Sequence, residues 1–190
     1  MLRYAADIRT IAFISVFFIL EAGAWLAVAP TTWTIAANVI VLSLFAFFGA
    51  VITHNTVHVP IFRSRVLNKA FQVVLTLVYG HPVSMFVPGH NLSHHMNTQQ
   101  PRDAMRTHKL RWRWNLLNVL LFTATVTPQI LKGNLQYAQS MRTRNPRWFN
   151  QLVLETTVML AVFAALLLVN WKLFLLYVFI PHQYAQWGIV

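Results

Sequence analysis

Residues 33–58 read WTIAANVIVLSLFAFFGAVITHNTVH, an apolar run that ends in two histidines. The part from Trp33 to Val51 is long enough to cross a bilayer, which takes about 20 mostly apolar residues in a helix. His54 and His58 follow it, where the helix is expected to leave the lipid. Side chains four positions apart share a helix face, and neutral imidazole is a common metal ligand. The stretch therefore predicts a membrane span with a pair of candidate ligands at its end.

Three more stretches have the length of a span. The chain is 57% hydrophobic and only 10% charged, which is more apolar than a soluble domain. We expect an all-α membrane protein with four transmembrane helices in two hairpins, forming a single domain over residues 1–190. The first span is expected to be retained rather than cleaved as a signal peptide, because its apolar run continues past Ala22-Gly23-Ala24. The expected spans are residues 11–29, 33–51, 152–170 and 171–190.

The net charge of +11 is concentrated between the second and third spans. Basic residues mark the cytoplasmic side of a membrane protein, so both termini and a helical cap over residues 52–150 are predicted to be cytoplasmic. We expect a multi-pass protein of a bacterial inner membrane or the endoplasmic reticulum. Within the cap, residues 70–79 and 116–131 are too short or too polar to cross and are expected at the surface.

The run Lys109-Leu110-Arg111-Trp112-Arg113-Trp114 alternates basic and apolar side chains, three of its members being cationic and two indole. This pattern suits the lipid headgroup layer. An acidic electron carrier is an alternative partner. Binding of single-stranded nucleic acid also uses interleaved cations and aromatic rings, but beside membrane spans we expect no nucleic acid.

A second histidine cluster reads His90-Asn91-Leu92-Ser93-His94-His95. His90 and His94 repeat the four-residue spacing, with His95 expected on the neighbouring face. With no cysteine and four acidic residues in the chain, five clustered imidazoles predict a metal centre held mainly by nitrogen.

Three other kinds of metal site fit these residues poorly. A zinc peptidase needs a glutamate where Asn55 stands. Carboxylate-bridged di-iron bundles need several glutamates, whereas Asp103 is the single acid near a cluster. Haem in a membrane bundle takes single histidines on facing helices, not doublets at the ends of spans.

The pattern HxxxH after the second span, followed by HxxxHH in Phe86-Val87-Pro88-Gly89-His90-Asn91-Leu92-Ser93-His94-His95, resembles the membrane-bound fatty acid desaturase family. The resemblance covers the whole chain and implies a non-haem di-iron centre, which uses dioxygen and two electrons to place a double bond in an acyl chain. It implies a fatty acyl substrate and an electron donor such as a ferredoxin or a cytochrome b5-type protein. The iron ligands it implies are His54, His58, His90, His94 and His95.

The family also has a third box, HxxHH, which these residues lack. We therefore expect an N-terminal portion that is inactive alone and binds at most one metal ion. A related di-iron hydroxylase or ketolase is the alternative enzyme, and a metal-binding membrane protein or inactive fragment is the alternative of another class.

Several polar residues near these segments have open roles. Asp103 either orients a ligand imidazole or caps a helix beginning at Ala104, and Asn55 and Asn91 are candidates for polar contacts beside the boxes. Glu21 and His182 lie within expected spans without an assigned role. His81 and His108 are expected to be structural or solvated.

Overall fold

The computed structural model describes residues 2–98, 100–103, 105–106 and 116–189. This part of the chain is 85% helical and has no strand; Leu2 and Phe62 form an isolated antiparallel bridge. The expected all-α fold is confirmed. His108 and the basic run from Lys109 to Trp114 lie outside the described residues, so contact of that run with headgroups stays a prediction.

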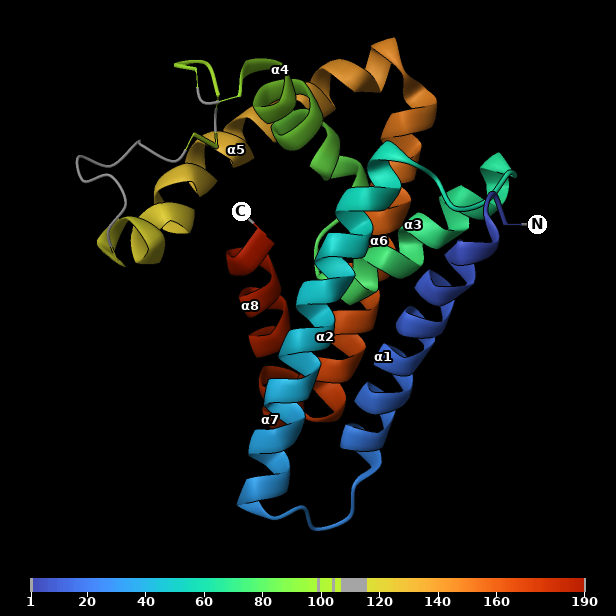
Figure 1. Ribbon diagram of the computed structural model, residues 1–190, viewed down its shortest axis with the longest axis vertical. Coiled ribbons are helices and arrows are strands. Elements are labelled where there is room, and N and C mark those ends of the chain that lie inside the picture. Colours follow the sequence, from blue (N-terminus) through green and yellow to red (C-terminus); the bar gives the residue numbers. More distant parts are fainter. Residues whose placement is uncertain (1, 99, 104, 107–115, 190) are drawn as a thin grey trace. The chain divides into compact units, whose positions relative to one another are not determined.

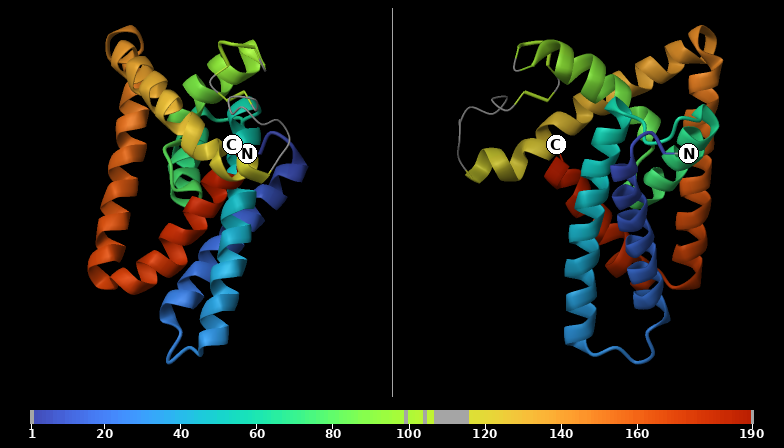
Figure 2. Two further views of the ribbon diagram at one scale, coloured as in Figure 1. Left: turned by 90° about the vertical axis from the view of Figure 1, so that its left-hand side faces the viewer. Right: turned by 45° about the vertical axis from the view of Figure 1, so that its right-hand side comes forward.

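The first two expected spans form a helical hairpin. The 3₁₀ turn η1 (Ala5–Asp7) leads into α1 (Ile8–Leu26), which lies beside α2 (Thr32–His58) in Figures 1 and 2. Phe13 of α1 stacks on Phe45 of α2 with ring centroids 4.6 Å apart. Both helices are long and apolar enough to cross a membrane. α2 continues beyond Val51 to His58, so both histidines of the first pair lie on the helix.

The third expected span is also present. It is part of α6 (Pro146–Val169), a third helix long and apolar enough to cross. Proline suits the first position of a helix, where a backbone N–H has no partner in any case. The side chain of Asn145 accepts a hydrogen bond from the Trp148 N–H at 3.2 Å, which caps the start of α6.

The segment expected as the fourth span is helical but interrupted. It consists of α7 (Trp171–Phe174), the π-helix η4 (Leu175–Phe179) and α8 (Ile180–Ile189). None of these is among the three helices that meet the criteria for a span in the described residues. The polar side chains of His182, Gln183 and Gln186 in α8 explain why this part is less apolar than a typical span.

The structure offers a different fourth candidate. α3 (Arg65–Tyr79) and residues Val83–Asn97 are apolar enough when taken together, but they are bent by 86° at the break between them, as in a broken span or a re-entrant loop. This region contains η2 (Val83–Met85), the π-helix η3 (Val87–His94) and α4 (His95–Asn97). The sequence predicts residues 70–79 as surface structure of a cytoplasmic cap, and the cap stays a prediction.

α5 (Leu116–Arg144) is longer than the surface segment expected at residues 116–131, because Pro128 does not end it. Proline lacks the N–H for a helical bond, and the hydroxyls of Thr125 and Thr127 donate to carbonyls one turn back. The chain divides into two compact units, Met1–Val83 with Leu154–Ile189, and Ser84–Val153; α5 and η3 belong to the second.

In the first unit, α2, α3 and α8 pack closely. A Cβ at Gly49 would overlap Val78, so this glycine lets α2 approach α3. α3 ends at Gly80, which has the left-handed φ of 72°. Its carbonyl accepts a hydrogen bond from the Gln186 side chain at 3.1 Å, and the buried ring of His182 lies against it. α8 is thereby held at the end of α3.

We predict that Gly80→Ala destabilises the first unit. A left-handed backbone costs other residues about 1–2 kcal/mol, and the new Cβ would stand 2.5 Å from His182 Cγ. The midpoint of thermal unfolding in detergent should fall by at least about 3 °C.

The matched control is Gly23→Ala in α1, where a Cβ would meet nothing within 4 Å. This variant should keep the midpoint or raise it, because alanine is a better helix former than glycine. Equal midpoints for the two variants would contradict the role given to Gly80.

Candidate metal centre

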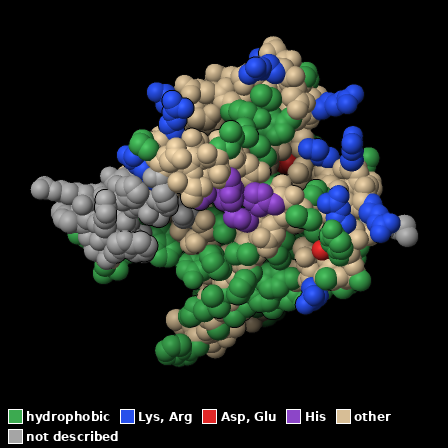
Figure 3. Space-filling model, turned by 45° about the horizontal axis from the view of Figure 1, so that its top comes forward, with side chains coloured by type: hydrophobic (Ala, Val, Ile, Leu, Met, Phe, Trp, Pro, Cys, Tyr) green, Lys and Arg blue, Asp and Glu red, His purple; other side chains and the backbone are tan. Residues whose placement is uncertain are grey.

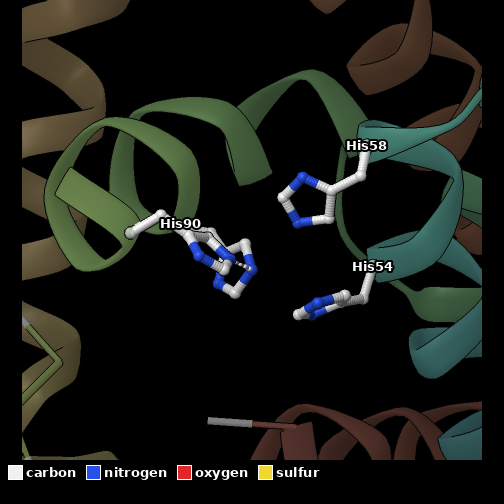
Figure 4. Close-up of side chains that lie close together, drawn as sticks. His54, His58 and His90 are labelled. Atoms are coloured by element: carbon white, nitrogen blue, oxygen red, sulfur yellow. Dashed lines mark hydrogen bonds between the residues drawn. The ribbon is translucent and has the colours of Figure 1, made fainter. Parts of the chain in front are cut away.

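The first pair of histidines projects from the end of α2 (Figure 4). His54 is half-buried and His58 is exposed, and their rings lie edge to face with centroids 5.1 Å apart. The helix is regular here, since the Val59 N–H bonds to the carbonyl of Asn55, four residues back. The prediction that the two imidazoles share a face is confirmed.

The second cluster lies on a helix with a different winding. In the π-helix η3, backbone N–H groups bond to carbonyls five residues back rather than four, and the His95 N–H bonds in this way to the carbonyl of His90. The ring of His95 is therefore brought to the ring of His90, with Nε2 atoms 2.9 Å apart. The His90 and His95 centroids are 4.5 Å apart, against 5.8 Å for His90 and His94.

This pairing differs from the α-helical expectation, in which His94 shared the face of His90 and His95 pointed elsewhere. The expectation assumed 3.6 residues per turn, whereas the wider π turn aligns residues five apart. Adjacent nitrogens bound to one metal ion at about 2.0–2.1 Å would stand about 3 Å apart. The His90–His95 separation of 2.9 Å therefore suits two ligands of one ion as well as a hydrogen bond between neutral rings.

Asp103 contacts His94 directly. One carboxylate oxygen, Oδ2, lies 3.0 Å from His94 Nδ1, and the Asp103 side chain is fully buried. The other oxygen, Oδ1, accepts a hydrogen bond from the Met105 N–H at 2.8 Å, an Asx turn. If Nδ1 donates its hydrogen to Asp103, Nε2 of His94 keeps a lone pair for a metal. The orienting role for Asp103 thus has the geometry it needs, while Ala104, where a capped helix was expected to start, lies outside the described residues.

Each histidine box brings imidazole rings together within its own unit: His54 with His58 on α2, and His90 with His95 at the end of η3. The donors are all imidazole, which suits first-row transition metals such as iron, copper, nickel and zinc, rather than magnesium or calcium. Each pair is therefore compatible with a metal site.

Histidine side chains are visible from outside on the face drawn in Figure 3, consistent with the exposure of His58 and His95. Lys and Arg side chains are frequent on this face and acidic ones are few (Figure 3). A metal ion or a negatively charged partner would meet a predominantly basic surface here.

The other polar residues singled out in the sequence are not histidines of the two boxes. The buried ring of His182 stacks on Phe163 with centroids 5.4 Å apart, and its Nδ1 has no hydrogen-bond partner. Glu21 is half-buried on α1, and His81 follows α3 with its Nδ1 3.2 Å from the Pro82 carbonyl. Asn55 is exposed, whereas Asn91 has a buried amide oxygen without a partner. Sequence reasoning missed the contact of His182 with Gly80, since no local pattern indicates it.

Comparison with known protein families agrees with this geometry. The family model described as fatty acid desaturase matches residues 30–190, which include α2 and both histidine boxes. The chain belongs to the fatty acid desaturase family. No curated protein and no solved structure matched the chain.

Membership in the desaturase family confirms the resemblance carried by HxxxH and HxxxHH. The family implies an oxidoreductase in general terms. Together with the three candidate spans, it indicates a membrane protein.

We predict that Asp103→Asn weakens metal binding about 10- to 100-fold, as loss of an outer-shell carboxylate commonly does. The substitution removes the negative charge that faces His94 but keeps an oxygen for the Met105 N–H. Affinity can be measured by titrating the purified metal-free protein with Co²⁺ and following its absorption bands.

Asp103→Ala, which loses the turn as well, is the comparison. If Asp103→Asn binds Co²⁺ as tightly as the wild type and Asp103→Ala alone unfolds earlier, the carboxylate serves the turn and not the histidine.

Proposed function

We propose that this protein is a fatty acyl desaturase, which uses dioxygen to introduce a double bond into an acyl chain. The main support is membership in the fatty acid desaturase family, together with the paired imidazoles of each histidine box, His54 with His58 and His90 with His95. Removal of hydrogen from an unactivated methylene requires a redox-active centre. Zinc has no redox chemistry, so iron is the metal that we propose.

The proposed iron ligands are His54, His58, His90 and His95, with His94 reaching a metal through Nε2. Bound iron would supply the redox chemistry that activates dioxygen and removes two hydrogens from neighbouring carbons. The role of the protein is to hold these imidazoles in place. α2 positions the first pair, the π turn of η3 pairs His90 with His95, and Asp103 accepts the Nδ1 hydrogen of His94.

The family implies two irons, and five histidines do not complete the coordination of both. We therefore propose that these five histidines hold a single ion, the second iron needing ligands other than these five.

The membrane helices suggest how an acyl chain is supplied. α1, α2 and α6 can each cross a bilayer, and α2 ends in His54 and His58, so we propose that the metal lies at the lipid edge. The excess of basic residues between the spans supports a cytoplasmic position for the boxes. It also favours an acidic electron donor, such as a ferredoxin or a cytochrome b5-type protein.

A single shared ion makes a prediction about stoichiometry. The purified protein should bind about one Co²⁺ or Fe²⁺ per chain, and either His54→Ala or His95→Ala should reduce this to near zero, because both boxes hold the same ion. Metal content is measured by mass spectrometry after gel filtration.

His81→Ala is the control, since His81 belongs to neither histidine box and its loss should leave the metal content unchanged. Two ions per chain, with one retained after each box substitution, would mean that the boxes bind metal independently.

The reaction itself can be identified from its products. Cells that express the gene for this protein should accumulate unsaturated fatty acids without added oxygen, as read by gas chromatography and mass spectrometry. His90→Ala and His94→Ala should abolish the new product while leaving membrane insertion intact, because each removes a proposed iron ligand.

His81→Ala should keep the product. Hydroxylated or keto acids in place of alkenes would identify a hydroxylase or ketolase instead. An unaltered lipid profile with normal metal binding would favour a metal-binding membrane protein.

A further inference from the structure

A cavity of about 340 Å³ lies within the unit Ser84–Val153, lined by η3 and α5. Gly89 and Ser93 line it from η3, and Lys132, Gly133 and Asn134 line it from α5. Its volume falls at the lower end of the range for small-molecule sites, about 300–1,000 Å³. It is large enough for a small polar group, and no metal ligand proposed above lines it.

Two cations line this cavity. Arg102 and Lys132 both contribute to its wall, and no Asp or Glu is among the described residues that do so. Guanidinium and ammonium groups are the side chains that most often bind phosphate, through charge-assisted hydrogen bonds. The charge of the cavity therefore selects an anion.

The side chain of Asn134 favours a ligand that also carries a hydrogen-bond donor. This side chain is only 4% exposed, and its amide oxygen has no hydrogen-bond partner. A Cβ at position 89 would stand 3.3 Å from that oxygen, so glycine there keeps the space beside the amide free of a side chain. A buried acceptor without a donor is unfavourable, and a ligand hydroxyl would satisfy it. The cavity thus combines cations for an anion with an acceptor for a hydroxyl.

The same short helix carries the second histidine box. Pro88, Gly89, Leu92 and Ser93 line the cavity, while His90 and His95 form the metal-compatible pair. A ligand in the cavity would therefore contact the same helix as His90, which is a suitable position for the head of an acyl substrate.

We propose that this cavity binds the phosphate group of a hydroxyl-bearing phosphate ester. Its assignment as the head of the acyl substrate rests on the proposed function, whereas the binding itself does not. Two sources carry this chemistry: the headgroup of a membrane lipid such as phosphatidylglycerol, and a soluble ester such as coenzyme A.

The test is ligand binding to the purified metal-free protein, measured by native mass spectrometry. The probes are short-chain phosphatidylglycerol, the diacylglycerol that lacks its phosphate, and coenzyme A. We expect at least one phosphate ester to bind and the diacylglycerol not to bind. Displacement of bound phosphatidylglycerol by glycerol phosphate and not by coenzyme A would indicate the lipid source; tighter binding of coenzyme A would indicate the soluble one.

Three variants locate the binding site. The double variant Arg102→Ala/Lys132→Ala should weaken binding at least about tenfold. Gly133→Leu should do the same without a change in charge, because a Cβ at Gly133 meets nothing within 4 Å and the larger side chain would occupy the cavity. The matched control Arg142→Ala/Arg144→Ala removes two exposed cations at the end of the same helix and should change affinity less than about twofold.

Equal weakening by both double variants would overturn the proposal, since it would show attraction to overall positive charge. Equal binding of diacylglycerol, or full binding by Gly133→Leu, would overturn it as well. His90→Ala should retain phosphate binding, so failure of the proposed metal chemistry and failure of this cavity are distinguishable.

Discussion

The backbone hydrogen bond from the His95 N–H to the His90 carbonyl sets the geometry of the second histidine box. An α-helix would align His90 with His94, but the π turn aligns it with His95 and brings their Nε2 atoms to 2.9 Å. π turns are rare and occur often at functional sites. As a consequence of the π turn, His94 is not part of that pair, and its Nδ1 lies against the carboxylate of Asp103 instead.

η3 and the first residue of α4 carry two kinds of side chain. The imidazoles occupy positions 90, 94 and 95, while positions 88, 89, 92 and 93 line a cavity with Arg102 and Lys132. Nitrogen donors suit a transition metal, and fixed cations suit a phosphate.

In the other unit, close packing depends on small residues and on one left-handed turn. Gly49 lets α2 approach Val78 of α3, and Gly80 lets the chain leave α3 beneath the ring of His182. Leu42, Ala46, Leu75 and Tyr177 are buried in the same unit. This packing explains the polar residues of α8. Gln186 and His182 contact the end of α3, and they make α8 too polar for a typical span.

The sequence by itself determined the helical class, three candidate spans, the two histidine boxes and the family, because these depend on local hydrophobic runs and residue spacing. Tertiary structure decided which histidines pair, that Asp103 contacts His94, and that residues 171–189 form an interrupted helix while residues 65–97 contain a bent one. A four-residue spacing has one meaning in an α-helix and another in a π-helix, and nothing in the spacing reveals the winding. The contacts of Gly80 with His182 and of Gly89 with Asn134 join residues distant in the chain, so packing alone could bring them together.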